Sequence, residues 1–344
     1  MGMVSYTPLF QWPNITEHSP AVEHVSQGTS RTIDRTEIGL DPLSDVLELI
    51  GFKSSIYFQK NFCGHWKMSI ANTGFAQFHF IVRGNAFVES ESRTAQLTAG
   101  DLILFPKGAT HAICDHPDTP AIRGQDVIAA MEKGVEPFID GPPTTRMVCG
   151  HFEYDLTHLH PFMRDLPACI LIRGSDLEIE SLMSALLPLI VSETRSLPLG
   201  GRIVAKHLSQ ALFASILRVH FEQDETKIGF YAGLRNDRII RAIAAIHEAD
   251  GWKHSLSDLA AIAGMSRSSF ANKFKQHVGQ TAGEYASTWR LLKARQSLQD
   301  RGKTIDQVAH EHGYASASAF SRAFRDTLGM SPSHARKSDT IQAQ

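Results

Sequence analysis

The sequence contains few cysteines, and no two of them are close together. Four cysteines occur in 344 residues, and they are Cys63, Cys114, Cys149 and Cys169. A disulfide framework requires a denser set, and a C-x-x-C redox or zinc motif requires a closer pair. We therefore expect reduced thiols, as in proteins of the cytoplasm.

Long apolar runs are also missing. No stretch approaches the roughly 18 consecutive apolar residues that cross a membrane. The first residues lack the basic segment and apolar run of a secretory leader. The chain is 42% hydrophobic and 20% charged, which is typical of a globular protein. These features predict a cytoplasmic protein with no membrane partner.

The net charge is small but unevenly distributed. The chain has 34 Lys and Arg against 36 Asp and Glu, a formal charge of −2. Residues 235–337 carry 16 basic and 9 acidic residues (+7), which leaves 18 against 27 (−9) for the remainder. This asymmetry favours a module that binds a polyanion, although a solvated basic surface would give the same balance.

Changes in periodicity divide the chain into segments. Residues 1–38 are polar and aperiodic, and we predict a flexible arm. Residues 39–176 contain short β-like runs such as FHFIV and LILFP, the pattern of an antiparallel barrel or sandwich. Residues 177–223 have a helical period, 224–236 form a polar linker, and 237–337 are helical throughout. We predict a multidomain α+β protein with an N-terminal β-barrel, a helical coupling or dimerisation segment and a C-terminal all-α domain.

The helical C-terminal part contains an internal repeat. FANKFKQHVG, residues 270–279, is echoed by FSRAFRDTLG, residues 320–329. A short helical pattern precedes each copy and ends at Gly264 or Gly313, because glycine adopts positive φ at little cost. Capping residues are predicted at the start of each helix, and they are Ser255 with Asp258, Thr304 with Gln307, Ser266 and Ser316.

Each repeat has two phenylalanines four residues apart. Phe270 and Phe274, like Phe320 and Phe324, would share the buried face of a second helix. A short helix, a tight turn with glycine and a second helix constitute a helix-turn-helix motif. Two copies in register within a basic segment therefore predict a double helix-turn-helix.

The segment between the repeats fits a rigid spacer. Thr281 and Glu284 predict a capping box at its start. Four apolar or aromatic residues are placed to face the two motifs, and they are Tyr285, Trp289, Leu292 and Leu298. A helix from residue 282 to 300 would be about 28 Å long. Two recognition helices on one face of duplex DNA must lie about one turn, ~34 Å, apart, so one chain could reach two major grooves.

With these motifs in place, residues 238–336 resemble the DNA-binding domain of the AraC/XylS family of bacterial transcription regulators. The matching stretches are SLSDLAAIAGMSRSSFANKFKQHVGQTAGEY, WRLLKARQSL and TIDQVAHEHGYASASAFSRAFRDTLGMSP. The resemblance implies binding to double-stranded promoter DNA and transcriptional activation, or less often repression, with RNA polymerase as a partner.

Outward positions of the two recognition helices are the candidate DNA contacts. The family's base-reading positions correspond to Ser268 and Asn272, and asparagine suits adenine. Arg322 is the strongest candidate for reading guanine, with a phosphate contact or a surface ion pair as the alternative. Lys273, Lys275 and Arg325 are expected to lie at or near phosphates, where they would position the protein without reading sequence. The remaining candidates are Arg267, Gln276, Ser318 and Ser321.

The barrel segment contains a second motif. AGDLILFPKGATHAI has the spacing G-x5-P-x-G-x2-H, ending at His111, and FHFIVRGNAFVE contributes His79. Both stretches resemble the two signatures of the cupin barrels. The resemblance implies a small-molecule effector held in the barrel, with His79 and His111 as candidate contacts.

The metal ligands of metal-dependent cupins are incomplete here. Ile81 stands where a second histidine would be, and no glutamate follows at the expected distance. Cys149 and His151 alternate along a later strand and therefore face the same way. With His79 and His111 they could form a zinc site, or all four could be buried structural residues. We predict no catalytic residues and no required cofactor. His116, His158 and His160 are predicted to be solvated.

Three functional hypotheses follow. The first is an effector-controlled, DNA-binding transcription regulator, expected to be a homodimer and an activator rather than an enzyme. The second is a cupin metalloenzyme, such as a dioxygenase or isomerase, with a DNA-binding tail. The third is an architectural DNA binder with a vestigial barrel. The incomplete ligand set favours the first over the second.

Overall fold

The fold was obtained as a computed structural model, which describes residues 40–51, 53–72, 74–154, 160–176, 182–196, 198–223 and 228–341. The predicted arm, residues 1–38, lies outside these ranges, as do parts of the predicted coupling segment and linker. Within the described ranges, no helix is both long and apolar enough to cross a membrane.

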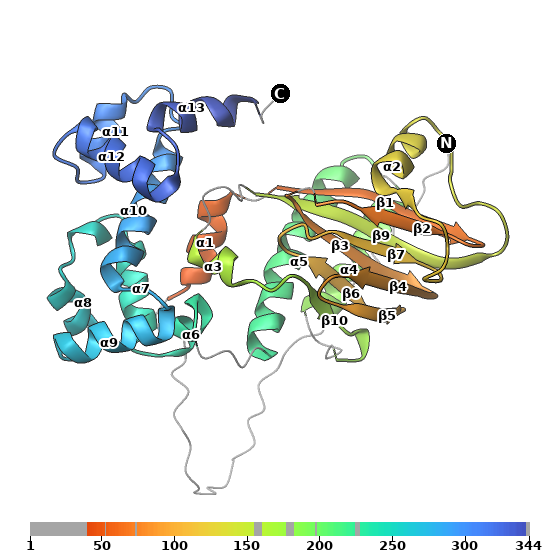
Figure 1. The fold of residues 1–344 in the computed structure, drawn as a ribbon, viewed down its shortest axis with the longest axis horizontal. Coiled ribbons are helices and arrows are strands. Elements are labelled where there is room, and N and C mark those ends of the chain that lie inside the picture. Colours follow the sequence, from red (N-terminus) through yellow and green to blue (C-terminus); the bar gives the residue numbers. More distant parts are fainter. Residues whose placement is uncertain are drawn as a thin grey trace, which may run out of the picture. The chain divides into compact units, whose positions relative to one another are not determined.

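The N-terminal half is formed by two five-stranded sheets (Figure 1). One has the strand order β1-β9-β3-β6-β10 and the other β5-β4-β7-β2-β8. The elements are α1 (Pro42–Ile50), β1 (Lys53–Cys63), β2 (Lys67–Ile70), β3 (Ala76–Arg83), β4 (Asn85–Ser90), β5 (Thr94–Thr98), β6 (Leu102–Phe105), β7 (His111–Cys114), β8 (Ile122–Arg123), α2 (Gly124–Glu132), β9 (Pro143–Glu153), α3 (Pro161–Asp165) and β10 (Ile170–Ile172).

The cupin-type sheet architecture agrees with the prediction, but the sheets do not close into a barrel. Their pairing is antiparallel except where β2 meets β8. The pattern of residues 126–146 predicts a long loop or insertion, yet its first part belongs to helix α2. Val127 of this helix is buried with the core residues between the sheets, because the helix packs beside β2.

The first sheet is buried on both faces. In β6, Ile103 and Phe105 join the core between the sheets, whereas Leu102 and Leu104 join the core on the opposite face. Alternate residues of a strand point to opposite faces, so the LILF run gives one strand that serves two cores. The same alternation places His79 of β3 and Cys149 of β9 toward the space between the sheets.

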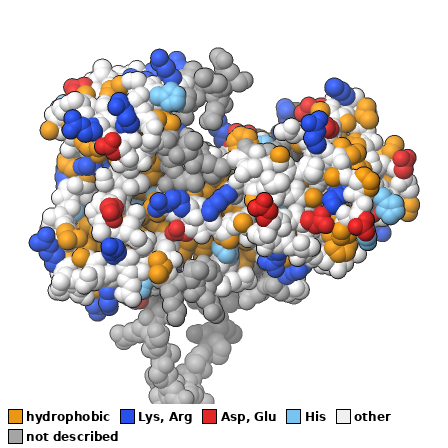
Figure 2. Space-filling view, viewed as in Figure 1, with side chains coloured by type: hydrophobic (Ala, Val, Ile, Leu, Met, Phe, Trp, Pro, Cys, Tyr) orange, Lys and Arg blue, Asp and Glu red, His pale blue; other side chains and the backbone are white. Residues whose placement is uncertain are grey.

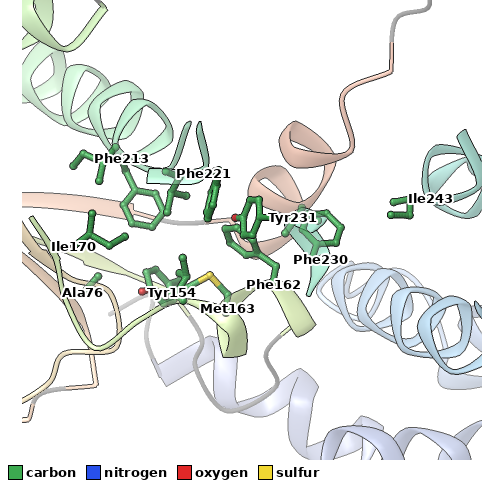
Figure 3. Packing of buried hydrophobic residues seen from close by; sticks show 14 of the residues in the cluster. Ala76, Tyr154, Phe162, Met163, Ile170, Phe213, Phe221, Phe230, Tyr231 and Ile243 are labelled. Carbon is green, nitrogen blue, oxygen red and sulfur yellow. The ribbon is translucent and has the colours of Figure 1, made fainter. Parts of the chain in front are cut away.

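Helices cover the outer face of this sheet and continue into the C-terminal domain. Helices α4 (Leu182–Ser196) and α5 (Gly201–Gln223) pack on β1 and on each other. Figure 3 shows aromatic residues of this core, among them Phe213 and Phe221 of α5 and Phe162 of α3. Phe162 also contacts Tyr231 of α6 (Phe230–Arg235), with 5.1 Å between ring centroids.

The C-terminal part is helical, as predicted. It contains α7 (Ile239–His247), the 3₁₀ turn η4 (Gly251–Lys253), α8 (Leu256–Ile262), α9 (Arg267–Val278), α10 (Ala282–Ser297), α11 (Ile305–Glu311), α12 (Ala317–Leu328) and α13 (Pro332–Ile341). All three predicted capping boxes are present, at Ser255, Thr281 and Thr304. Ser266 and Ser316 cap α9 and α12 through backbone N–H groups.

Gly264 and Gly313 occupy equivalent turns but have different surroundings. Both have positive φ, +62° and +73°. A Cβ on Gly264 would meet nothing within 4 Å, whereas one on Gly313 would lie 2.5 Å from the ring of Trp252. Trp252 belongs to η4, the turn that precedes the first motif, so its ring packs this turn against the second motif.

This difference yields a matched pair of substitutions. Gly264→Ala should cost about 1 kcal/mol of stability, because alanine disfavours the left-handed conformation. Gly313→Ala should cost at least ~1 kcal/mol more, because the indole must also move. Urea unfolding followed by helical circular dichroism measures both. Equal losses in the two variants would mean that the Trp252 contact contributes nothing.

Candidate DNA-reading surface and sensor core

Helix α10 is the shared support of two helix-turn-helix units. The first unit is formed by α8 and α9, and the second by α11 and α12. Tyr285 and Trp289 in the first half of α10 belong to the core that contains Phe270 and Phe274. Leu291, Leu292 and Ala294 in its second half, followed by Leu298, belong to the core that contains Phe320 and Phe324. The predicted spacer is therefore a helix that is buried against both units.

The aromatic pairs anchor the two recognition helices, α9 and α12. All four phenylalanines are fully buried. Ring centroids are 5.5 Å apart in the first pair and 5.3 Å in the second, both in edge-to-face geometry. With this face fixed inward, the opposite face of each helix is left to solvent.

The predicted DNA contacts lie on these outward faces. On α9 all six candidates are exposed, and they are Arg267, Ser268, Asn272, Lys273, Lys275 and Gln276. On α12, Ser318, Arg322 and Arg325 are exposed and Ser321 is half-buried. Figure 2 shows Lys and Arg side chains over the surface of these C-terminal helices, on the left of the view.

Arg322 is free to reach a ligand. Within the described ranges, neither Arg322 nor Arg325 forms an ion pair, so the predicted alternative of a surface ion pair for Arg322 has no partner there. Guanidinium groups held on a rigid helix without an acidic partner can form two hydrogen bonds with a guanine edge or contact a phosphate.

Between the sheets, the two predicted cupin histidines lie side by side. His79 Nε2 is 2.9 Å from His111 Nε2, and His79 Nδ1 is 3.0 Å from Cys149 Sγ. His111 Nδ1 lies 2.7 Å from the Ala109 carbonyl oxygen, and its ring stacks on Phe105 at 3.7 Å. The histidines and Cys149 are at most 5% exposed.

These contacts fix one arrangement of protons. His111 donates Nδ1–H to the Ala109 carbonyl, so its Nε2 accepts from His79 Nε2–H. His79 Nδ1 then accepts from the Cys149 thiol. Burial lowers the pKa of His111 to about 4, and burial together with His111 holds the pKa of His79 well below 6.5. Burial also raises the pKa of Cys149. All three groups are thus neutral at pH 7.

The zinc alternative does not fit this geometry. Cys149 and His111 contact opposite nitrogens of the His79 ring, so their donor atoms do not converge on one point. His151 is 2.8 Å from the Glu153 carboxylate, on the same strand. In the part of the chain described, no group of three or more His, Cys, Asp or Glu side chains could hold a metal ion.

A cluster that the sequence did not reveal lies where α1 and α3 meet α7 and α10. It contains Asp45, His160, His247 and Tyr285. The prediction that His160 is solvated is wrong, since the residue is only 2% exposed. His158 lies outside the described residues, and His116 is exposed. A motif search finds no signal for this cluster, because its members come from four elements spread over 240 residues.

Acid sensitivity of the sensor core tests its neutral state. Unfolded histidine is protonated below about pH 6.5, but folded His111 only near pH 4. The stability that neutral His111 contributes is therefore present above about pH 6.5 and is lost as the pH falls toward 4. Between about pH 7.5 and 5, the free energy of unfolding measured with urea should fall by about 2 kcal/mol because of His111 alone.

Two variants isolate this contribution. His111→Gln should reduce the pH dependence of unfolding, because glutamine does not titrate yet can still accept from His79. His116→Gln removes an exposed histidine of the same domain and should leave the dependence unchanged. An unchanged dependence in His111→Gln would contradict the assignment.

Family models match both parts of this architecture. A family model described as Cupin matches residues 41–222, and one described as Helix-turn-helix domain matches residues 259–338. A putative AraC-like transcription regulator of Streptomyces lividans is 28% identical over 88% of this chain and its own full length. One of Streptomyces antibioticus is 28% identical over 87% of this chain and 99% of its own. The crystal structure of ToxT from Vibrio cholerae is 12% identical and covers 82% of this chain and 96% of its own, with a TM-score of 0.33.

Proposed function

Because this chain belongs to the AraC/XylS family of DNA-binding transcription regulators, with an N-terminal cupin domain, we propose that it activates promoters under the control of a small molecule. One observation carries the proposal. Two helix-turn-helix units are buried against the two halves of α10, and each leaves the outward face of its recognition helix to solvent. A single chain can thereby present two reading helices to one duplex.

We propose separate roles for the exposed side chains of the recognition helices. Arg322 reads guanine and Asn272, beside Ser268, reads adenine. Lys273, Lys275 and Arg325 contact phosphates and orient the chain without reading sequence. Their exposure and the lack of a described acidic partner for Arg322 support this division.

We further propose that the division into segments at 39–176, 177–223, 224–236 and 237–337 is functional. The segment 39–176 senses the effector, and His79 and His111 are among the groups that respond to it. The segment 237–337 binds DNA in the cytoplasm and contacts RNA polymerase. The enzyme alternative has no support, because the relatives compared are named as transcription regulators and the side chains of His79, His111 and Cys149 hydrogen-bond one another. The architectural hypothesis predicts footprints that no metabolite changes.

A homodimer is proposed from the outer faces of α4 and α5. Leu182 and Leu189, one heptad apart on α4, are 50% and 52% exposed, and Ile203 and Val204 of α5 are 52% and 44% exposed. Because α4 and α5 pack on each other, these exposed apolar side chains lie on neighbouring helices, as is typical of interaction surfaces. The same patch on a second copy would cover them in an isologous contact.

The reading role of Arg322 is tested against Arg325. Arg322→Ala should weaken binding to a selected duplex by about 1–3 kcal/mol and relax the preference at one base pair. Arg325→Ala should weaken binding to all sequences alike and reduce the salt dependence. Binding of the full-length chain is measured on duplexes enriched from a random pool. A uniform loss in Arg322→Ala would instead make Arg322 a phosphate contact.

The proposed dimer face is tested by sedimentation. Leu189→Asp should lower the sedimenting mass toward that of one chain, because a buried unpaired carboxylate opposes association. Glu193→Asp, on the same helix, is the control and should not change the mass. If Leu189→Asp sediments like the unaltered protein, α4 is not the dimer contact.

A further inference from the structure

A line of polar side chains, buried except for Asp45 at one end, links the sensor to the helices that support DNA reading. Asp45 of α1 lies 3.0 Å from His247 Nδ1 at the end of α7. His247 Nε2 lies 2.7 Å from the Tyr285 hydroxyl of α10, which lies 2.9 Å from His160 Nε2 at the start of α3. We refer to these four side chains as the polar row. His160, Tyr285 and His247 are at most 7% exposed.

The hydrogen bonds of the polar row run in one direction. The Phe162 N–H donates to His160 Nδ1, so the proton of neutral His160 is on Nε2 and is donated to the Tyr285 oxygen. The Tyr285 hydroxyl can then donate only to His247 Nε2, and His247 donates Nδ1–H to the Asp45 carboxylate. Each hydrogen bond along the line thus has an assigned donor and acceptor, and opening either bond of the Tyr285 hydroxyl leaves a buried polar group without its partner.

Aromatic rings pack against the two histidines of the polar row and shield them from solvent. Trp289 of α10 stacks on the His247 ring at 3.5 Å and 10°. His160 meets Phe230 edge-on at 5.0 Å and Trp289 at 5.7 Å. Burial lowers the pKa of both histidines, well below 6.5 for His160, which is consistent with neutral rings. In such surroundings water cannot readily replace a lost partner.

On the sensor side, both ends of the polar row are tied to the same end of one sheet. Helix α1, which carries Asp45, ends at Ile50, and β1 starts at Lys53. Strand β9 ends at Glu153, which pairs with Lys53, and α3 is the next described element. Strand β9 also places Cys149 opposite His79. A shift of β9 in the sensor core therefore has a short path to both Asp45 and His160.

On the DNA-binding side, the polar row attaches to α10 and α7. Tyr285 lies in the first half of α10, where the ring of Phe274 from α9 is 5.9 Å away. Helix α10 supports both recognition helices. The same side chain thus contacts the sensor, the first recognition unit and the shared support.

From these contacts we infer that the polar row is the latch through which the sensor controls the DNA-binding helices. This inference rests on the proposed function for its DNA readout. While the three bonds between these four side chains are intact, α1 and α3 are held on α7 and α10 and restrict how the two units meet DNA. When the latch opens, these helices separate and the affinity for DNA changes. The latch is a bistable element that the sensor can bias.

The latch is tested with Tyr285→Phe, which removes the hydroxyl and keeps the ring. The matched control is Tyr231→Phe, because the Tyr231 hydroxyl is also buried but has no hydrogen-bond partner among the described residues. Hydrogen exchange in the full-length chain should accelerate at least about tenfold in α1 and α3 for Tyr285→Phe. Exchange in α12 should be unchanged, which excludes general unfolding, and Tyr231→Phe should match the unaltered protein.

A second pair of variants covers the case in which Tyr285→Phe does not fold. Asp45→Ala removes the final acceptor at a half-exposed position, and Glu48→Ala alters an exposed acid on the same helix. Asp45→Ala should accelerate exchange in α1 and α3 in the same direction, whereas Glu48→Ala should have no effect. If the folded variants of Tyr285 and Asp45 both exchange like their controls, the latch does not exist.

DNA binding supplies the second readout. On a duplex enriched from a random pool by the unaltered chain, Tyr285→Phe and Asp45→Ala should shift Kd in the same direction. The shift for Tyr285→Phe should be about tenfold, and neither control should shift. Because the two variants open one latch, their combination should add little to Tyr285→Phe alone. Unchanged affinity despite accelerated exchange would reject the regulatory role. Failure of the unaltered chain to enrich any duplex would instead reject the proposed function, with the exchange result unaffected.

Discussion

The burial of α10 against both helix-turn-helix units fixes the position of each recognition helix. Its first half packs into the core that holds Phe270 and Phe274, and its second half into the core that holds Phe320 and Phe324. Because each recognition helix is anchored by two phenylalanines on one face, its reading face is fixed relative to α10. Neither unit can rotate without exposing aromatic area, and burial of such area is the main stabilising term in a small helical unit.

The same helix explains how sensing and reading can be coupled in one chain. Tyr285 lies on the face of α10 that also meets the sensor, where its hydroxyl bridges His160 and His247. The sensor interior contains a comparable arrangement, in which Cys149, His79 and His111 satisfy one another. In both arrangements the histidines are buried and their hydrogen-bond partners define one order of donors and acceptors, so breaking a bond leaves a buried polar atom unpaired.

Local rules made the C-terminal domain predictable. Capping boxes at Ser255 and Thr304, glycines at 264 and 313 and phenylalanines four residues apart act within one or two turns of a helix, and the sequence displays them directly. The pairing of His79 with His111 was also accessible, because the cupin signatures locate both. The solvation of His160 was mispredicted because its burial depends on α7 and α10, about 90 and 125 residues further along the chain. The unclosed sheets and helix α2 were missed for a similar reason, since strand closure and helix packing depend on distant contacts.

Hydroxyl-radical footprinting of the full-length chain, on a duplex that it enriches from a random pool, tests most directly whether one chain places two reading helices on one duplex. We expect two protected patches on one face of the duplex, about one helical turn apart, because α10 spaces the two reading helices. Substitutions in α9 and in α12 should each remove a different patch. A single protected patch, or two patches lost together when α12 alone is altered, would contradict the account.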